Sequence, residues 1–268
     1  MNQVKNVLFI TWEKSRRSKS LSTTLGIPLY QIDFDNHNQV LRYILCILQT
    51  IRLIKSLKPK LLICQNPSII LITLTLLVRP LFRYILFVDA HNAGVEFDKQ
   101  NRFLKTWLAW IHRKSDITIV TNKGLEDVVK QNGGTAIILP DPLPQIDILS
   151  LNKKKLGDQF SICFICTFHG DEPYENVFDA MKGVPSSVSL YVTGTPPSKI
   201  DTTRLSSNIR LMGFLPEPDF WSLLYSVDII MDLTMRDNCL VCGAYEGTAL
   251  KKPLILSDTR ATRDYFCT

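Results

Sequence analysis

Short runs of β-branched and apolar residues recur along the chain with helix-length segments between them, and this alternation restricts the fold more than any other feature. Strands joined by segments of helix length pair in parallel, because antiparallel neighbours need only a short turn. The strands predicted in the first half are residues 7–11, 61–64, 85–88, 117–120 and 136–139. This half therefore predicts a parallel sheet with crossover helices.

The segment 140–144 (PDPLP) interrupts this pattern. Its prolines remove backbone donors and exclude helix, so we interpret it as an interdomain linker. A second series follows it at 161–166, 189–192, 209–212, 229–231 and 254–256. A helix is predicted over 218–226, which begins with proline and carries acidic residues near its start. The sequence thus predicts an α/β chain with two Rossmann-like domains, residues 1–140 and 141–268.

Composition places the chain among soluble globular proteins, with 46% hydrophobic and 21% charged residues in 268. Seven cysteines are scattered without a compact framework, and the first residues lack the apolar stretch of a signal peptide, so we expect a reducing, cytoplasmic setting. Residues 1–146 hold 19 Lys and Arg against 10 Asp and Glu, whereas the remainder holds 12 against 15. A basic first half suits a membrane leaflet, a phosphate-bearing acceptor or nucleic acid, and a solvated basic face accounts for it equally well.

Two neighbouring stretches in the first half are the most apolar of the chain. Residues 68–78 are too few to span a bilayer, which needs roughly 20, so we expect a buried helix there. Residues 41–60 are apolar on most sides with five basic residues scattered among them. This stretch is not a clean amphipathic helix, and core packing is favoured over peripheral membrane contact.

Two short motifs are excluded as metal sites. The pairs Cys163/Cys166 and Cys239/Cys242 lie too far apart for a zinc site, and residues three apart in a strand point to opposite faces. We expect buried, reduced cysteines. The DFD motif at 33–35 spells a metal-binding DxD, but its polar surroundings favour a turn. No GxGxxG follows the first strand and no GxxxxGK[ST] occurs, which argues against dinucleotide oxidoreductases and P-loop NTPases.

The segment 237–253 (DNCLVCGAYEGTALKKP) is the most informative motif. It resembles the donor-site signature of retaining GT-B glycosyltransferases of glycosyltransferase family 4: an acidic residue, seven further residues and a glutamate, then a small-residue helix, a turn ending in proline and a strand. Glu246 matches the glutamate that in such enzymes accepts hydrogen bonds from the ribose hydroxyls. A carboxylate offers two acceptor oxygens to a vicinal diol. Glu246 could equally be a charge that complements the helix dipole.

The resemblance extends over nearly the whole chain. Residues 191–196, 212–216 and 227–231 resemble the run that precedes the donor signature, with Gly194 in a glycine turn and Gly243 in the signature itself. In the first half, residues 11–18 follow the first strand where the family places acceptor and phosphate contacts, which implicates Arg16 and Arg17, unless both are merely solvated. His91 follows the strand 85–88 where many members place a histidine beside the donor sugar; by itself it would be an ordinary loop residue.

Three departures from the family pattern change what is expected. With seven residues before Glu246, the position of the family's acidic residue is occupied by Asn238. The adjacent Asp237 is therefore the candidate to replace that acid. The loop 167–173 lacks the usual Arg and Lys of the diphosphate site, so phosphate contacts are expected from backbone N–H groups and from residues near the loop. These candidates are Gly170, His169 and Arg236. The chain stops after residue 268, where the family continues, so we expect an incomplete second domain.

The resemblance implies a glycosyltransferase whose second domain binds the donor and whose first domain faces the acceptor. It would move a hexose-type sugar from a nucleotide diphosphate to a glycan or lipid-linked acceptor in surface polysaccharide synthesis, with His91 and Asp237 as catalytic residues. No metal, cofactor or nucleic acid is implied. The expected location is the cytoplasm, with peripheral contact at the inner, anionic face of the membrane. Two alternatives stay open: a non-catalytic remnant that at most binds nucleotide, and a sugar-nucleotide epimerase of the same fold.

Overall fold

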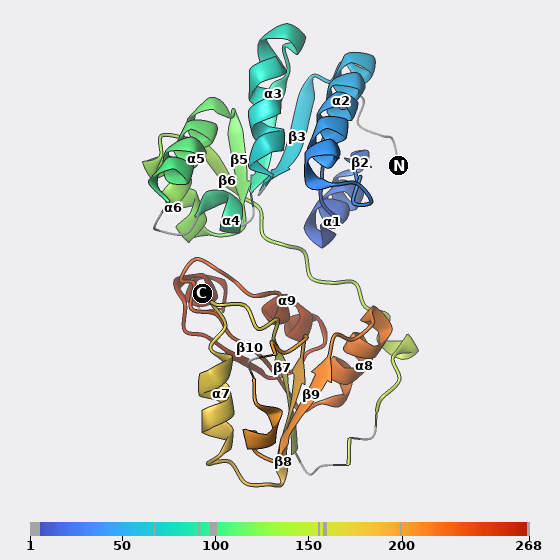
Figure 1. Ribbon diagram of the computed structural model, residues 1–268, viewed down its shortest axis with the longest axis vertical. Helices are drawn as coiled ribbons and strands as arrows, with labels where there is room; N and C mark the ends of the chain where they lie inside the picture. The colour runs from blue at the N-terminus through green and yellow to red at the C-terminus, as the bar shows by residue number, and fades with distance from the viewer. Residues whose placement is uncertain are drawn as a thin grey trace. The chain divides into compact units, whose positions relative to one another are not determined.

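The computed structural model describes residues 6–66, 68–90, 92–96, 101–154, 156–157, 160–198 and 200–266. The chain divides into two compact units, residues 1–141 and 142–268 (Figure 1). The division falls inside the proline-rich segment. Each unit contains one parallel sheet, which confirms the predicted α/β class with two Rossmann-like sheets.

The sheet of the first unit has six strands in the order β2-β1-β3-β4-β5-β6. Every neighbouring pair is parallel. The strands are β1 (Val7–Thr11), β2 (Leu29–Gln31), β3 (Leu61–Asn66), β4 (Ile85–Ala90), β5 (Ile117–Val120) and β6 (Ala136–Ile138). The sequence analysis missed β2, because its three residues, Leu29, Tyr30 and Gln31, do not form a continuous apolar run.

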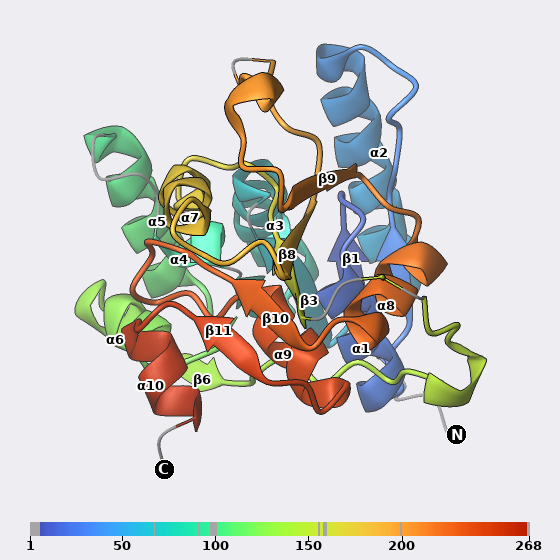
Figure 2. The ribbon, with the colours of Figure 1, turned by 90° about the horizontal axis from the view of Figure 1, so that it is seen from below.

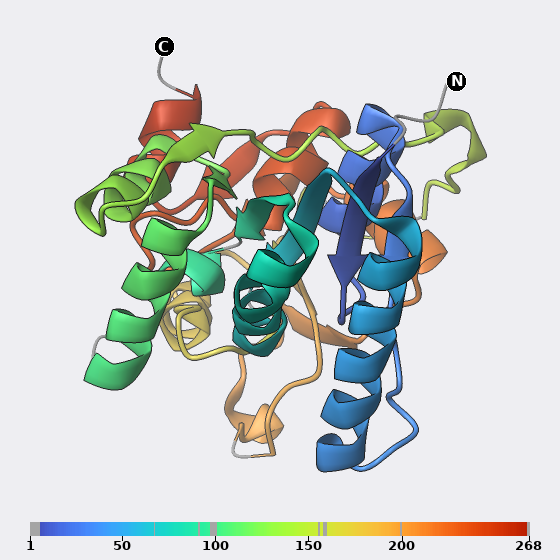
Figure 3. The same ribbon diagram turned by 90° about the horizontal axis from the view of Figure 1, so that it is seen from above.

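Helices lie between these strands in the chain. They are α1 (Arg16–Leu25), α2 (Gln39–Leu57), α3 (Ile69–Phe82), α4 (Asn92–Val95), α5 (Arg102–Lys114) and α6 (Lys123–Gln131). Figure 3 shows α2, α3 and α5 side by side, with α3 in the middle, and both neighbours contact α3. The larger core lies beneath these helices, and a smaller cluster that includes Leu21 of α1 and Phe9 covers the other face of the sheet.

The sheet of the second unit has five parallel strands in the order β11-β10-β7-β8-β9. They are β7 (Phe160–Ile165), β8 (Val188–Thr193), β9 (Ile209–Gly213), β10 (Ile229–Asp232) and β11 (Leu254–Leu256). Short 3-10 turns at Ile148–Ser150 and Thr202–Arg204 lie in the connections. The helices are α7 (Tyr174–Met181), α8 (Glu217–Ser226), α9 (Cys242–Ala249) and α10 (Arg260–Phe266). The helix predicted over 218–226 is confirmed, with proline in its first turn.

Both faces of the second sheet are covered. Phe178 of α7 packs with Phe164 in one cluster, whereas Leu223 of α8 packs with Cys163 in another. Figure 2 shows α7 on one side of the strands and α8 and α9 on the other. Cys163 and Cys166 therefore point into different clusters, as the strand geometry predicted.

Three expectations about individual segments have definite outcomes. The DFD motif forms a turn, in which the backbone N–H of Asp35 donates to Oδ1 of Asp33 over 3.0 Å. The expectation of buried cysteines is wrong for Cys242, which is exposed at the start of α9, where a helix end meets solvent. Core packing accounts for only one side of α2 and α3, because their outward faces expose large apolar residues. Among the described residues, no helix is long and apolar enough to cross a membrane.

Candidate functional site

Polar side chains gather at the carboxyl edge of the second sheet. The loop 166–173 follows β7, the loop 233–241 follows β10, and α9 begins directly after that second loop. Because β7 and β10 are parallel neighbours, their carboxyl ends open onto the same edge. The chain continues from β7 to β8 on one side and from β10 to β11 on the other. Such a reversal of strand order is where open α/β sheets bind ligands.

Asp232, the last residue of β10, holds the start of α9. Its Oδ2 accepts a hydrogen bond of 2.8 Å from the backbone N–H of Gly243. A Cβ on Gly243 would lie 2.6 Å from the Cβ of Asp232, so only glycine allows this approach. Gly243, predicted as a donor contact, thus has a packing reason for its identity. The sequence analysis missed Asp232, although an acid that ends a buried apolar strand could have been noticed.

The buried carboxyl group of Asp232 has an altered acidity. Burial raises its pKa to about 8, and the nearby Glu246 and Glu172 add to that rise, whereas the Gly243 N–H opposes it. Burial also raises the pKa of the Cys163 thiol, with further contributions from Glu246 and Asp232. A neighbouring negative charge favours the neutral form of a carboxyl group. Asp232 therefore keeps its proton more readily than an exposed aspartate does.

Glu246, the predicted ribose contact, lies on α9 with only 6% of its surface exposed. It follows Gly243 by one helical turn, so the anchored start of α9 also positions this glutamate. Small residues on the same helix make the burial feasible: a Cβ on Gly247 would approach Leu254 Cδ2 to 2.2 Å. The glycine-rich composition of the signature therefore lets α9 pack closely on β10 and β11, carrying Glu246 with it.

Asp171 organises the loop that follows β7. Its carboxylate forms a hydrogen bond with Nδ1 of His169 and a 2.9 Å ion pair with Nε of Arg236. The hydroxyl of Thr234 also donates to it over 3.0 Å, and its carbonyl oxygen accepts from the N–H of Met235. Although burial alone would raise the pKa of Asp171, the bonds from His169 and Thr234 and the charge of Arg236 lower it.

Three predicted phosphate contacts are thus brought together in one exposed group. His169 and Arg236 share the Asp171 carboxylate, and Gly170 lies between His169 and Asp171 in the chain. Glu172 fixes the same loop by accepting from the backbone N–H groups of Thr167 and His169, each over 2.9 Å. The sequence analysis did not name Asp171, since its role depends on which loops meet.

The remaining predicted residues of this unit have structural partners. Gly194 adopts a φ of +84°, and a Cβ there would lie 2.0 Å from the carbonyl oxygen of Cys166, so glycine is required for the two strands to end side by side. The exposed Asp237 accepts from the backbone N–H of Arg260 over 2.8 Å, at the start of α10. Asn238 follows it and is half-buried. Asp237 therefore tethers α10 to the loop after β10.

In the first unit, Arg17 is buried and surrounded by acceptors. Its Nε donates to Asp89 over 2.9 Å, its Nη1 pairs with Asp141 at 2.5 Å, and its Nη2 donates to the carbonyl oxygen of Leu139 over 2.9 Å. Burial disfavours its charge, but the two aspartates outweigh this effect and raise its pKa. With the guanidinium engaged in this way, the expected anion contact rests on the neighbouring Arg16, which is exposed at the start of α1. His91 lies outside the described residues.

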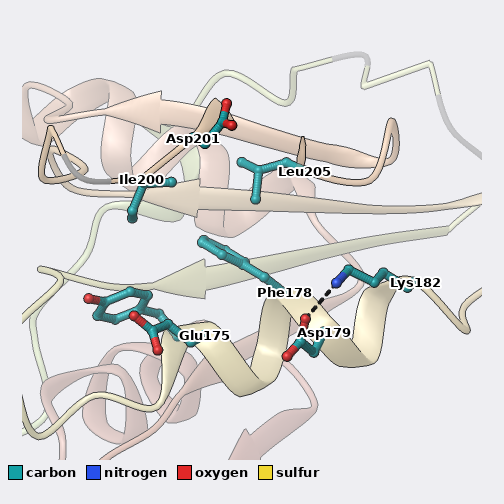
Figure 4. Close-up of a pocket in the computed structure, with 8 residues that line it drawn as sticks. Glu175, Phe178, Asp179, Lys182, Ile200, Asp201 and Leu205 are labelled. Carbon is teal, nitrogen blue, oxygen red and sulfur yellow. Dashed lines mark hydrogen bonds and ion pairs between the residues drawn. The ribbon is translucent and has the colours of Figure 1, made fainter. Parts of the chain in front are cut away.

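A separate surface pocket of 440 Å³ lies between α7 and the connection that follows β8 (Figure 4). Phe178 and Leu205 give it an apolar floor, and Glu175, Asp179 and Asp201 give it a negative rim. Lys182 donates to Asp179 over 2.7 Å. An anionic phosphate would be repelled here, so this pocket does not suit a nucleotide. Among the described residues, no group of three or more His, Cys, Asp and Glu side chains could hold a metal ion.

No protein-family model matches the sequence, and no curated protein matches it. Solved structures do resemble it in fold. HepE from Anabaena, in complex with UDP-glucose, has a TM-score of 0.67 at 13% identity over 96% of this chain and 81% of that one. Sucrose-phosphate synthase from Thermosynechococcus elongatus has a TM-score of 0.73 at 11% identity, over 96% of this chain and 82% of that one. UDP-GlcNAc 2-epimerase from Methanocaldococcus jannaschii has a TM-score of 0.59 at 11% identity, over 93% of this chain and 83% of that one. The chain therefore has the GT-B-like fold that nucleotide-sugar glycosyltransferases and UDP-GlcNAc epimerases share.

Proposed function

We propose that the chain is a nucleotide-sugar-dependent glycosyltransferase that transfers a hexose-type sugar. The observation that carries the proposal is the buried Glu246, held on α9 by the bond between Asp232 and Gly243 at the carboxyl edge of the sheet. A buried carboxylate at such an edge suits a neutral ligand with paired hydroxyls, such as a ribose. HepE, which has a similar fold, is found with UDP-glucose.

The other residues of this edge have complementary roles in the proposal. Arg236 and His169 contact the diphosphate with the backbone around Gly170, because these groups supply positive charge and N–H donors. Asn238 and Asp237 face the sugar, and Gly194 and Gly243 keep the backbone close enough for the donor. Residues 142–268 thus form the donor domain, and residues 1–141 the acceptor side.

The reaction follows from these contacts. An acceptor hydroxyl attacks the anomeric carbon, the bond from that carbon to the phosphate oxygen breaks, and the nucleoside diphosphate leaves and takes up the hydroxyl proton. Asp237 and His91 are the candidate catalytic side chains beside the sugar, and Arg16 contacts the acceptor or a phosphate. Donors aimed at the leaving diphosphate stabilise the charge that develops on it. No metal or separate cofactor enters this scheme.

The proposed acceptor is a glycan or a lipid-linked sugar used in surface polysaccharide synthesis. Its support is the positive charge of the first half of the chain, which suits a phosphate-bearing acceptor. The same proposal puts the protein in the cytoplasm, with peripheral contact at the inner face of the cytoplasmic membrane. Nucleic acid is not among the proposed partners.

Calorimetry with a panel of nucleoside diphosphates and their sugars tests the donor site. We expect binding in the micromolar range or tighter for at least one donor, and Glu246→Gln should weaken it at least tenfold, because a lost charged hydrogen bond contributes about 1.5–3 kcal/mol. Glu175→Gln on α7, an exposed glutamate, is the matched control and should change nothing. Unchanged binding in Glu246→Gln would refute the assignment of that residue.

Two alternatives make different predictions. A non-catalytic remnant would bind a nucleoside diphosphate without releasing sugar when acceptors are supplied. An epimerase is favoured by the similarity to UDP-GlcNAc 2-epimerases. It would convert the sugar nucleotide without any acceptor, which product analysis by chromatography detects. A folded chain that binds no nucleotide would contradict both enzymatic functions.

A further inference from the structure

The outward faces of α2 and α3 expose large apolar side chains. On α2 these residues include Val40, 71% exposed, with Leu41, Ile44 and Leu48 along the same helix. On α3, Leu77 is 67% exposed and Leu81 is 80% exposed, and Ile70 lies at the start of the helix. Single exposed apolar residues are ordinary, but two neighbouring helices that both carry them form a patch that needs an explanation.

The helical period separates this patch from the core. Leu41, Ile44 and Leu48 are three and four residues apart, so they lie on one side of α2, whereas Cys46, Thr50 and Ile54 form its buried side. On α3 the spacing of 70, 77 and 81 likewise gives one stripe, opposite Leu71, Ile72 and Thr75. The core is therefore filled without the outward residues.

The two stripes lie beside each other and lead to the same end of the sheet. The helices α2 and α3 are in contact, and each runs from the carboxyl edge of the first sheet to its amino edge, as the connections of parallel strands require (Figures 1 and 3). At the amino edge the chain after α2 meets the chain after α3: the N–H of Ile85 donates to the carbonyl oxygen of Lys60 over 2.9 Å. Exposed Leu57, Leu81 and Ile85 gather at this end.

Positive charge accumulates at the same end. No aspartate or glutamate occurs between Asp35 and Asp89, while that stretch contains lysine or arginine at 42, 52, 55, 58, 60, 79 and 83. Arg42 is paired with Asp35, and Arg79 with Asp116. In the described parts of the chain, no ion pair includes the other five, which are all exposed. These are Arg52, Lys55, Lys58, Lys60 and Arg83.

We propose that the apolar stripes of α2 and α3, with these five basic residues, form a docking surface for an anionic lipid bilayer. Apolar side chains enter the interfacial region of the bilayer, and the neighbouring lysines and arginines lie at the level of the acidic headgroups. A second copy of the chain is a poorer occupant, because pairing the same face would bring two unneutralised basic groups together. The surface acts at the membrane plane without any helix spanning it.

This inference deepens the proposed function, because it would hold the acceptor side of the enzyme at the surface where a lipid-linked acceptor lies. It stands on its own observations all the same. Vesicle binding needs no sugar nucleotide. A failure to bind vesicles would therefore not contradict the proposed donor site, and a failure to bind the donor would not contradict the proposed docking surface.

Co-sedimentation of the full chain with vesicles tests the proposal. We expect binding to phosphatidylcholine vesicles that contain phosphatidylglycerol, little binding to phosphatidylcholine alone, and loss of binding as salt is raised, because the attraction is screened. Equal binding to both kinds of vesicle, or no binding to either at low salt, would overturn the proposal. This comparison uses the unaltered protein, so it does not depend on how any variant folds.

Two sets of variants divide the surface into its parts. Lys55→Gln, Lys58→Gln and Arg83→Gln together should weaken binding to anionic vesicles on the order of a hundredfold, since each basic residue near such a surface contributes about fivefold. Leu77→Gln with Leu81→Gln should also weaken binding to anionic vesicles at low salt, because it removes an apolar contribution that adds to the electrostatic one. These side chains are exposed, so the thermal unfolding of each variant should match that of the parent.

Matched controls lie in other parts of the chain. Phe214→Gln removes an exposed aromatic residue of the second unit, and Lys182→Gln removes an exposed charge there. Both should bind vesicles like the parent. Light scattering distinguishes the other occupant: a dimer that Leu77→Gln and Leu81→Gln dissociate, in a chain indifferent to vesicles, would assign this face to self-association and refute the membrane proposal.

Discussion

The buried carboxyl group of Asp232 predicts that the second unit becomes less stable as the pH rises. Its pKa is raised from the usual 3.8 to about 8, by burial first and then by Glu246, Glu172 and Asp171. The thiols of Cys163 and Cys166 also face these acids. Above about pH 4 the unfolded chain loses a proton that the folded chain keeps. The stability that this proton contributes is complete below the unfolded pKa and is lost as the pH approaches about 8.

The magnitude follows from the same shift. Within that interval each pH unit costs the folded state about 1.4 kcal/mol relative to the unfolded one. Asp232→Asn removes the titration, and its amide oxygen can still accept the hydrogen bond from Gly243, 2.8 Å away in the parent. The free energy of unfolding of the variant minus that of the parent should therefore increase by about 2 kcal/mol between about pH 6 and about pH 7.5.

Hydrogen exchange of the amides in β10 and α9 is a suitable assay, because a chain with two units need not unfold in one transition. The measured quantity is the opening free energy of these elements at the two pH values, for parent and variant. Asp179→Asn, an exposed carboxyl group on α7, is the control and should leave the pH dependence unchanged. A constant difference between Asp232→Asn and the parent at both pH values would show that Asp232 takes up no proton on folding.

Three further predictions concern individual side chains. Arg17→Met should destabilise the first unit by about 3–5 kcal/mol, because it leaves the buried Asp89 carboxylate without its cation; normal stability with weaker substrate binding would instead favour an anion contact. Gly194→Ala should cost about 2–4 kcal/mol through its positive φ and its overlap with Cys166, whereas Gly170→Ala, with open space around it, should be neutral in thermal unfolding. His112 should titrate by NMR near pH 4, because burial lowers its pKa to about 4, and the free energy of unfolding should fall as the pH drops below about 6.5; a titration near pH 6.5 would contradict this.

The predicted strands were found because parallel strands between two layers of helices are short, continuous apolar runs between helix-length segments. This local signal does not require knowledge of the partners. It failed for β2, whose sequence (LYQ) is not a continuous apolar run, and it could not separate the two sides of α2 and α3. Their sequences are apolar on most sides, so only the packing of residues such as Cys46, Thr50 and Ile54 of α2 shows which side remains exposed.

For the candidate site, the sequence supplied the residues of the signature but not their partners. Glu246 and the glycines of α9 could be found because the signature is continuous in the chain. The role of Asp171 between His169 and Arg236 depends on two loops separated by more than 60 residues, and no local pattern reveals that meeting. The same holds for Arg17, whose expected exposure gives way to burial against Asp89.

The sequence by itself determined the parallel α/β architecture, the proline-rich division and the position of the signature helix, since each is written in contiguous residues whose backbone preferences and burial are local. The tertiary structure decided which charges are neutralised within the fold and which face solvent. Electrostatic pairing depends on distances across the sheet, and these arise only when strands far apart in the chain become neighbours. For this reason only the folded chain shows that Asp232 anchors the start of α9. The same is true of the surface formed by the exposed residues of α2 and α3.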